Sequence, residues 1–171
     1  MNNKLVNEFI EQSVFRIDEN TPKVQKCLDI LSEEQIWYQP NNSSNSIGNL
    51  ILHLCGNINQ YAVSSLGYTE DKRERDLEFS TKEGFNKAEL MERLKSTIKN
   101  AKTVIRKLDE KELLKMRSVQ GFNFTGIGII IHVTEHYSYH TGQIAFITKL
   151  LKNQDLGFYA GINLNIKNKT T

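Results

Sequence analysis

Apolar residues recur at every third or fourth position in four stretches of the chain, a spacing that is typical of amphipathic helices. These stretches cover about residues 3–31, 47–66, 87–108 and 126–151. The strand-type alternation of apolar and polar positions does not compete with this period. The pattern therefore predicts an all-α protein, a four-helix bundle, and facing helices of such bundles commonly build metal sites from inward side chains.

Residues that start or interrupt helices set the ends of these stretches. Ser46 is a suitable N-cap for the second helix, whereas Pro22 interrupts the first and predicts a kink or a restart there. The remaining segments are expected to be connectors: 32–46, the charged stretch 67–84, and 109–124. All residues from 1 to 171 are expected to form one domain, with 155–171 as an extended tail whose end is polar.

Composition and charge limit the classes of partner. The chain has 171 residues, 39% of them apolar, which is enough for one domain with its own core. With 22 basic and 20 acidic residues the net charge is +2, which does not indicate a nucleic-acid surface. We find no apolar signal segment in 1–8 and no run of membrane-spanning length, so we expect a soluble cytoplasmic protein without a membrane partner. Cys27 and Cys55 lie in apolar helical stretches, and we expect both to be free and buried.

Three of the four histidines follow one another at four-residue intervals in the last predicted helix: His132, His136 and His140. Each such step turns a helix by about 400° and advances it by about 6 Å, so neighbouring rings can point at one ion. The outer two rings are about 12 Å apart, and one ion must therefore choose an adjacent pair. The fourth histidine, His53, lies in the second predicted helix and can supply a further ligand.

The first pair belongs to His132-Val-Thr-Glu-His136, which matches the H-x-x-E-H pattern of inverted zinc peptidases. That pattern expects a further acidic ligand downstream, yet after Glu135 the chain has no glutamate and only Asp155. The second pair, His136 and His140, continues along an apolar face of the helix. We therefore favour the second pair, completed by His53, as the metal site.

Several segments resemble the DinB/YfiT-like superfamily, in particular a bacterial branch whose members have no assigned reaction. They are 45–57, 73–79 and 135–144, followed by Thr148-Lys-Leu150, and they occur in the expected order over nearly the whole chain. The resemblance implies a four-helix bundle with one long crossover, frequently a homodimer. It also implies a divalent metal on a histidine of the second helix and two of the fourth, which fall on His53, His136 and His140. The same superfamily includes bacillithiol, mycothiol and glutathione-type S-transferases and a maleylpyruvate isomerase.

Three neutral imidazoles leave a divalent ion at least one open position, which is the arrangement of catalytic rather than structural sites. Zinc is the usual metal for such ligands, and nickel, iron and manganese also accept imidazole. A thiol or a water molecule at the open position loses its proton more easily. We therefore expect a metal-dependent enzyme that acts on a small molecule, either a low-molecular-weight thiol S-transferase or a hydrolase. The alternatives are a non-catalytic dimeric protein that binds a metal or a small molecule, and a metal-free core whose histidines bond to one another.

Supporting residues are candidates near the expected ligands. Gln143 and Asn57 are one turn from ligands and can hydrogen-bond to their rings or to a substrate. Arg75, with Asp76 and Glu78, matches the family motif, and Arg75 can clamp the carboxylate of a thiol. Gln143 and Arg75 are therefore the candidate catalytic residues. The remaining neighbours are expected to pack or to point away from the site: Tyr137, Tyr139, His132 and Cys55.

Overall fold

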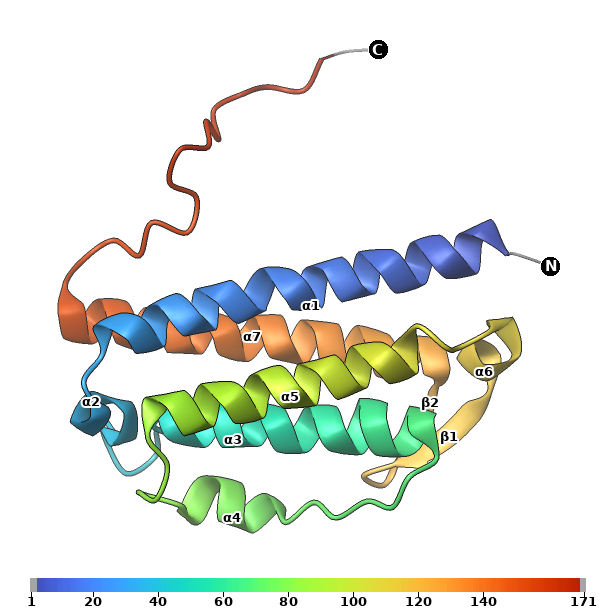
Figure 1. Ribbon diagram of the computed structural model, residues 1–171, viewed down its shortest axis with the longest axis horizontal. Helices are drawn as coiled ribbons and strands as arrows, with labels where there is room; N and C mark the ends of the chain where they lie inside the picture. Colours follow the sequence, from blue (N-terminus) through green and yellow to red (C-terminus); the bar gives the residue numbers. More distant parts are fainter. Residues whose placement is uncertain (1–2, 170–171) are drawn as a thin grey trace.

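Four long helices form most of this computed structural model, which describes residues 3–169 (Figure 1). They are α1 (Lys4–Ile30), α3 (Ile47–Ile58), α5 (Lys87–Ile105) and α7 (Gly126–Lys152), and α3 continues as a π-helical segment, η1 (Asn59–Leu66). Three short helices lie in the connectors: α2 (Glu33–Trp37), α4 (Arg75–Ser80) and α6 (Glu110–Leu114). Helices dominate the described chain, and the four long ones occupy the stretches predicted from the sequence.

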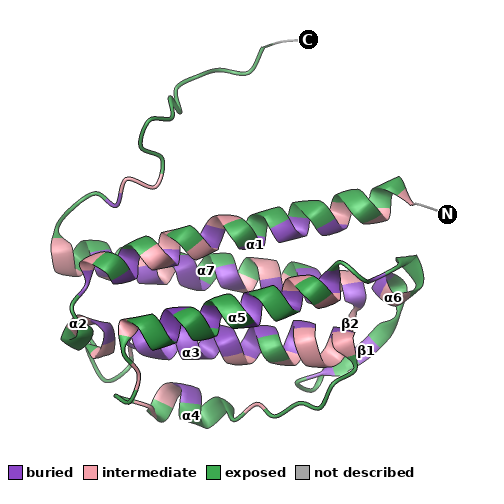
Figure 2. Ribbon diagram, viewed as in Figure 1, coloured by how far each residue is buried: buried purple, intermediate pink, exposed green. Residues whose placement is uncertain are grey.

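The central helix is α3, in which every residue except Gly56 is buried. Such a helix must pack on several sides, and α3 contacts α5, α7 and α4. Figure 2 shows it as an almost continuous buried ribbon behind α5. Its start follows the prediction, because the Ser46 hydroxyl accepts a hydrogen bond from the Asn49 backbone N–H (3.1 Å) in a capping box.

The connection between η1 and α5 returns the chain to the end of the molecule at which α3 began. Residues 67–86 run back along α3, and α4 lies in the middle of this path (Figure 1). As a result, α3 and α5 run in the same direction, while α1 packs against α7. The charged segment predicted as a loop thus contains a helix that contacts α3, and this contact positions residues at the site described below.

A two-stranded hairpin corrects the all-α prediction. Strands β1 (Met116–Val119) and β2 (Phe122–Thr125) pair antiparallel across a turn in which Gln120 and Gly121 both have positive φ, 53° and 82°. The strand pattern is hidden in the sequence because the buried positions of β1 include Arg117, only 8% exposed, while the apolar Met116 faces solvent. Arg117 donates hydrogen bonds to the carbonyl oxygens of Glu112 (2.8 Å) and Lys115 (2.9 Å), which makes its burial tolerable.

The first helix also differs from its prediction, because α1 does not restart at Pro22. Buried side chains continue on both sides of the proline, with Ile17 before it and Val24 after it. Packing of this face against α7 offsets the cost of a proline inside a helix, about 3 kcal/mol.

The cysteines follow their prediction, and the segment after α7 has no regular secondary structure within the described chain. Residues 155–169 contain no helix or strand, and residues 170–171 of the predicted tail lie outside the described residues. Cys27 and Cys55 are free and buried. None of the helices within residues 3–169 has the length and apolarity needed to cross a membrane.

Candidate metal centre

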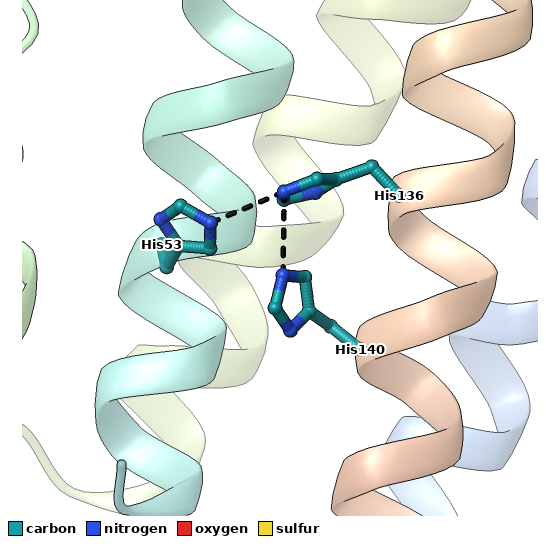
Figure 3. Close-up of side chains that lie close together, drawn as sticks. All are labelled: His53, His136 and His140. Atoms are coloured by element: carbon teal, nitrogen blue, oxygen red, sulfur yellow. Dashed lines mark hydrogen bonds between the residues drawn. The ribbon is translucent and has the colours of Figure 1, made fainter. Parts of the chain in front are cut away.

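Three histidines from two helices meet between α3 and α7 (Figure 3). His53 lies on α3, and His136 and His140 lie one turn apart on α7. The Nε2 atom of His136 is 3.2 Å from Nε2 of His53 and 3.2 Å from Nε2 of His140. The ligand atoms of the three side chains all lie within 4.8 Å of one another. The structure thus brings together the three residues that the sequence analysis proposed as metal ligands.

Two of the three separations match those expected around one ion. Nitrogen atoms that bind one tetrahedral zinc ion at its usual distance are about 3.3 Å apart. His136 Nε2 is 3.2 Å from each of the other two Nε2 atoms, and all three ligand atoms lie within 4.8 Å of one another.

The outward ring nitrogens determine which nitrogen of each histidine carries the proton. His53 Nδ1 lies 2.9 Å from Oε2 of Glu78, and His140 Nδ1 lies 2.7 Å from Oε1 of Gln143. Arg73 Nη2, a donor, also lies 3.2 Å from His53 Nδ1, but it donates to Oε2 of Glu78 over the shorter distance of 2.8 Å. Because Glu78 Oε2 and Gln143 Oε1 are acceptors, both Nδ1 atoms donate, and in the neutral rings both Nε2 atoms present lone pairs. Those lone pairs face Nε2 of His136, which has at most one proton to share between them. One of the two Nε2–Nε2 contacts of His136 then has no hydrogen to form a hydrogen bond. A cation bound between the rings would accept a lone pair from all three nitrogens. The three-histidine group is therefore compatible with a metal site.

Two of the proposed ligands, His136 and His140, are held in the neutral form that a metal requires. Burial, together with the smaller effects of the neighbouring rings of His140 and His53, lowers the pKa of His136 to about 3. Burial also lowers the pKa of His140 to about 4, although its bond to Gln143 opposes the shift. Neither ring is in the charged imidazolium form at neutral pH, so a metal ion that binds there does not have to displace a proton.

A buried ion pair stands behind His53. The Arg73 guanidinium donates to both carboxylate oxygens of Glu78, from Nε to Oε1 (2.7 Å) and from Nη2 to Oε2 (2.8 Å), and from Nη1 to the side chain of Gln60 (2.8 Å). Burial alone would raise the pKa of Glu78, but its bonds to Arg73 and His53 outweigh that effect and hold the pKa below its ordinary value. Glu78 is thus an ionised carboxylate, and in this form it accepts the hydrogen bond from His53 Nδ1.

The sequence analysis did not identify Arg73 or Gln60 and assigned no contact to Glu78. The only available signal was a glutamate between two apolar residues, Leu77 and Phe79, in a segment otherwise rich in charge. The contact of this glutamate with His53 arises because residues 67–86 run back along α3, and the periodicity of apolar residues does not predict that path.

His132 lies beside the three-histidine group but outside it. Its ring stacks on Tyr61 with centroids 4.1 Å apart, and its Nε2 atom accepts a hydrogen bond from Asn57 (3.2 Å). This placement matches the packing role expected for His132. Asn57 was expected near a ligand ring, but it contacts His132 instead.

The H-x-x-E-H interpretation receives no support from the position of its glutamate. Glu135 is exposed and lines a cavity of about 580 Å³ beside α1, together with Ser13 and Arg16. Glu78, from α4, is the carboxylate that contacts a ligand histidine.

Arg75 and Gln143, the two candidate catalytic residues, lie near different histidines, Arg75 near His53 through Phe79 and Gln143 beside His140. The exposed Arg75 guanidinium sits 4.8 Å from the centre of the Phe79 ring, which itself lies 4.8 Å from the His53 ring. Gln143 contacts His140 directly. Neither position tests a catalytic role.

Tyr137 and Cys55 have the buried positions expected of packing residues, whereas Tyr139, also expected to pack, is exposed. Tyr137 is fully buried and its hydroxyl donates to Thr21 (3.1 Å), while the exposed Tyr139 places its ring 5.0 Å from that of His140. Burial raises the pKa of Cys55 to about 12, and its thiol faces Thr97 of α5, away from the histidines.

An open cavity of about 630 Å³ adjoins the histidine group on the α7 side. Gln143 and Tyr139, which both contact His140, belong to its lining. Phe146, Ile147 and Leu150 form an apolar wall, and the segment that precedes α3 contributes serine and asparagine. None of the twelve lining residues is charged.

Comparison with solved structures supports the fold assignment. A conserved protein from Enterococcus faecalis aligns with a TM-score of 0.71 at 14% identity, over 84% of this chain and 97% of its own. A DinB-like protein from Bacillus subtilis, YjoA, aligns with a TM-score of 0.66 at 18% identity, over 86% and 96%. A DinB-like protein from Bacillus cereus gives 0.66 at 15% identity, over 82% and 91%. These neighbours confirm the DinB-like resemblance predicted from the sequence.

The sequence comparisons define the family. A search of curated proteins found no match. A family model, described as "Protein of unknown function (DUF1572)", matches residues 4–161. Because this match spans nearly the whole described chain and the solved neighbours share its fold, the protein belongs to the DUF1572 family and has a DinB-like fold.

Proposed function

We propose that the protein is a divalent-metal-dependent enzyme that uses His53, His136 and His140 to activate a low-molecular-weight thiol for transfer to an electrophile. The observation that carries this proposal is the convergence of three Nε2 atoms from two facing helices, in which His136 Nε2 lies 3.2 Å from that of His53 and 3.2 Å from that of His140. Zinc is the proposed metal because all three ligands are imidazoles. In this interpretation the long helices form the four-helix bundle of the family, and residues 67–86 are its long crossover.

A divalent ion at this site supplies Lewis acidity, which lowers the pKa of a coordinated thiol or water molecule. The arrangement of carboxylates favours the thiol. Hydrolysis gains from a free general base beside the attacking water, but both oxygens of Glu78 are engaged by Arg73 and His53, and Glu135 faces the α1 side. Thiol transfer requires no separate base once the thiol is ionised.

The protein's own side chains suit binding and orientation of two small molecules. The uncharged cavity next to Gln143 and Tyr139 suits an apolar electrophile, because no buried charge must be desolvated when it binds. Arg75, whose guanidinium lies over the Phe79 ring, suits the carboxylate of a thiol. We also propose that the protein forms a homodimer, as the family resemblance implies.

Cobalt substitution tests the reaction class. Sulfur ligands add an intense near-ultraviolet charge-transfer band to a cobalt spectrum, so the cobalt protein is titrated with cysteine, glutathione and bacillithiol. We expect at least one thiol to produce the band and to be transferred to a halogenated aromatic compound. His140→Ala should lose both signals, and the matched control His132→Ala should keep both.

Two results would redirect the assignment. If no thiol changes the cobalt spectrum while an ester or amide is cleaved, the enzyme is a hydrolase. If the protein holds metal but neither chemistry occurs, the non-catalytic binding protein replaces the proposed enzyme.

A further inference from the structure

The crossover segment reaches back to the histidine group through one carboxylate. Glu78 lies on α4, 25 residues beyond His53 in the sequence, yet its Oε2 atom is 2.9 Å from His53 Nδ1. The contact is shielded from solvent, because the side chains of His53 and Glu78 are 9% and 8% exposed and that of Arg73 is 3% exposed. A short charged helix would not be expected to bury a carboxylate unless the carboxylate had a partner there.

We infer that Glu78 is a positioning residue for the metal ligand His53, and that Arg73 holds Glu78 in place for this purpose. The carboxylate fixes His53 as the tautomer with its proton on Nδ1, so that the Nε2 lone pair faces His136 and His140. This inference rests on the metal site of the proposed function but not on its reaction.

Gly56 provides a second, independent observation. It is the one residue of α3 that is not buried, and it lies one turn after His53. A Cβ atom at this position would collide with Oε1 of Glu78 and would come within 3.0 Å of Arg73 Nε. The surface of α3 therefore has a space at Gly56 that the Glu78 carboxylate fills.

The three ligands differ in what supports their outer nitrogens. His53 donates to a carboxylate, His140 donates to the neutral amide of Gln143, and the buried Nδ1 atom of His136 has no hydrogen-bond partner. A carboxylate partner makes an imidazole a stronger ligand than an amide does, and loss of such a partner typically lowers metal affinity by about 10–100-fold. Glu78 should therefore contribute more to metal affinity than Gln143 does.

The test compares zinc affinities, measured by competition with a chromophoric chelator. Glu78→Gln keeps the shape of the side chain but removes its charge, and we expect zinc affinity to fall about 10–100-fold. Gly56→Ala leaves both charges in place and displaces the carboxylate, so it tests the contact without leaving Arg73 unpaired, and it should lower zinc affinity in the same direction. Glu74→Gln removes an exposed carboxylate from the same segment and should bind zinc as the wild type does.

A measurement on the metal-free protein separates positioning from general stability. Nitrogen-15 NMR reports the tautomer of each histidine, and His53 should carry its proton on Nδ1 in the wild type and in Glu74→Gln. In Glu78→Gln the amide oxygen should turn to Arg73 and the NH₂ group to His53, which shifts the His53 proton to Nε2.

The inference is overturned if both Glu78→Gln and Gly56→Ala bind zinc as tightly as the wild type. It is also overturned if His53 carries its proton on Nε2 in the wild type. Absence of zinc binding by the wild type would reject the metal site itself, and the tautomer would still decide whether Glu78 orients His53.

Discussion

At the scale of single residues, the four histidines share one chemistry but have different surroundings. His53 and His140 each donate from Nδ1 to a side-chain oxygen, whereas His132 stacks on Tyr61 and accepts from an amide. The direction in which each Nε2 lone pair points follows from these partners. Three of the four rings can therefore bind one ion, and His132 packs against Tyr61 beside them.

This difference predicts the outcome of single substitutions. Alanine at His53, His136 or His140 should abolish stoichiometric zinc, because two imidazoles do not hold the ion as three do. The control His132→Ala should retain about one ion per chain while losing some stability through its stacking contact. Metal content after dialysis, measured on protein purified without a histidine tag, checks both statements. Loss of zinc in His132→Ala together with its retention in His140→Ala would show that the other histidine pair binds the ion.

At the scale of elements, the long helices were predictable because their caps and their apolar faces are local. Ser46 begins α3 as expected, and the i,i+4 pair of α7 places His136 and His140 on one face. The hairpin was missed because its strands are four residues long and Arg117 occupies a buried position. The Arg73–Glu78 pair was missed for a different reason. Its contact with His53 depends on how α4 packs against α3, which is a tertiary property.

The α3 cap has a measurable role in stability. The Ser46 side chain is buried and accepts from the Asn49 N–H, while the Asn49 side chain donates to the Thr81 carbonyl oxygen (2.6 Å) just after α4. Ser46→Ala should lower the free energy of unfolding by about 1–2 kcal/mol, as at other N-caps. Urea unfolding measures the change. The exposed Ser80→Ala serves as control, with an expected change below about 0.5 kcal/mol, and equal effects of the two substitutions would contradict the role of the cap.

At the scale of the whole molecule, the candidate centre lies where two helices from distant parts of the chain meet beside the segment that joins η1 to α5. The α3 and α7 helices supply the ligands, and α4 supplies the carboxylate behind one of them (Figures 1 and 3). Burying several titratable groups together in this way ties the stability of the metal-free fold to their protonation states.

The metal-free protein should consequently lose stability as the pH falls below neutrality. In the fold, His136 and His140 have pKa values of about 3 and about 4, whereas in the unfolded chain both return to about 6.5. Between these values the unfolded chain binds more protons, so the free energy of unfolding decreases as the pH falls from about 6.5 towards 4. Glu78, whose pKa is lowered in the fold, contributes stability above its unfolded value of 4.5 and loses it as the pH falls through its folded value.

Urea unfolding in the presence of a chelator, from pH 7.5 to pH 4, measures this dependence. The double variant His136→Asn/His140→Asn lacks the two histidines with the lowest pKa values and should show a flatter profile between pH 6.5 and pH 4.5. Above pH 7 the histidines are neutral in both states, so the slope there should be the same in variant and wild type. An unchanged slope below pH 6.5 in the double variant would mean that these two rings are not kept neutral by the fold. In that case protons would compete with a metal ion for these two ligands once the pH falls below about 6.5, the ordinary pKa of histidine.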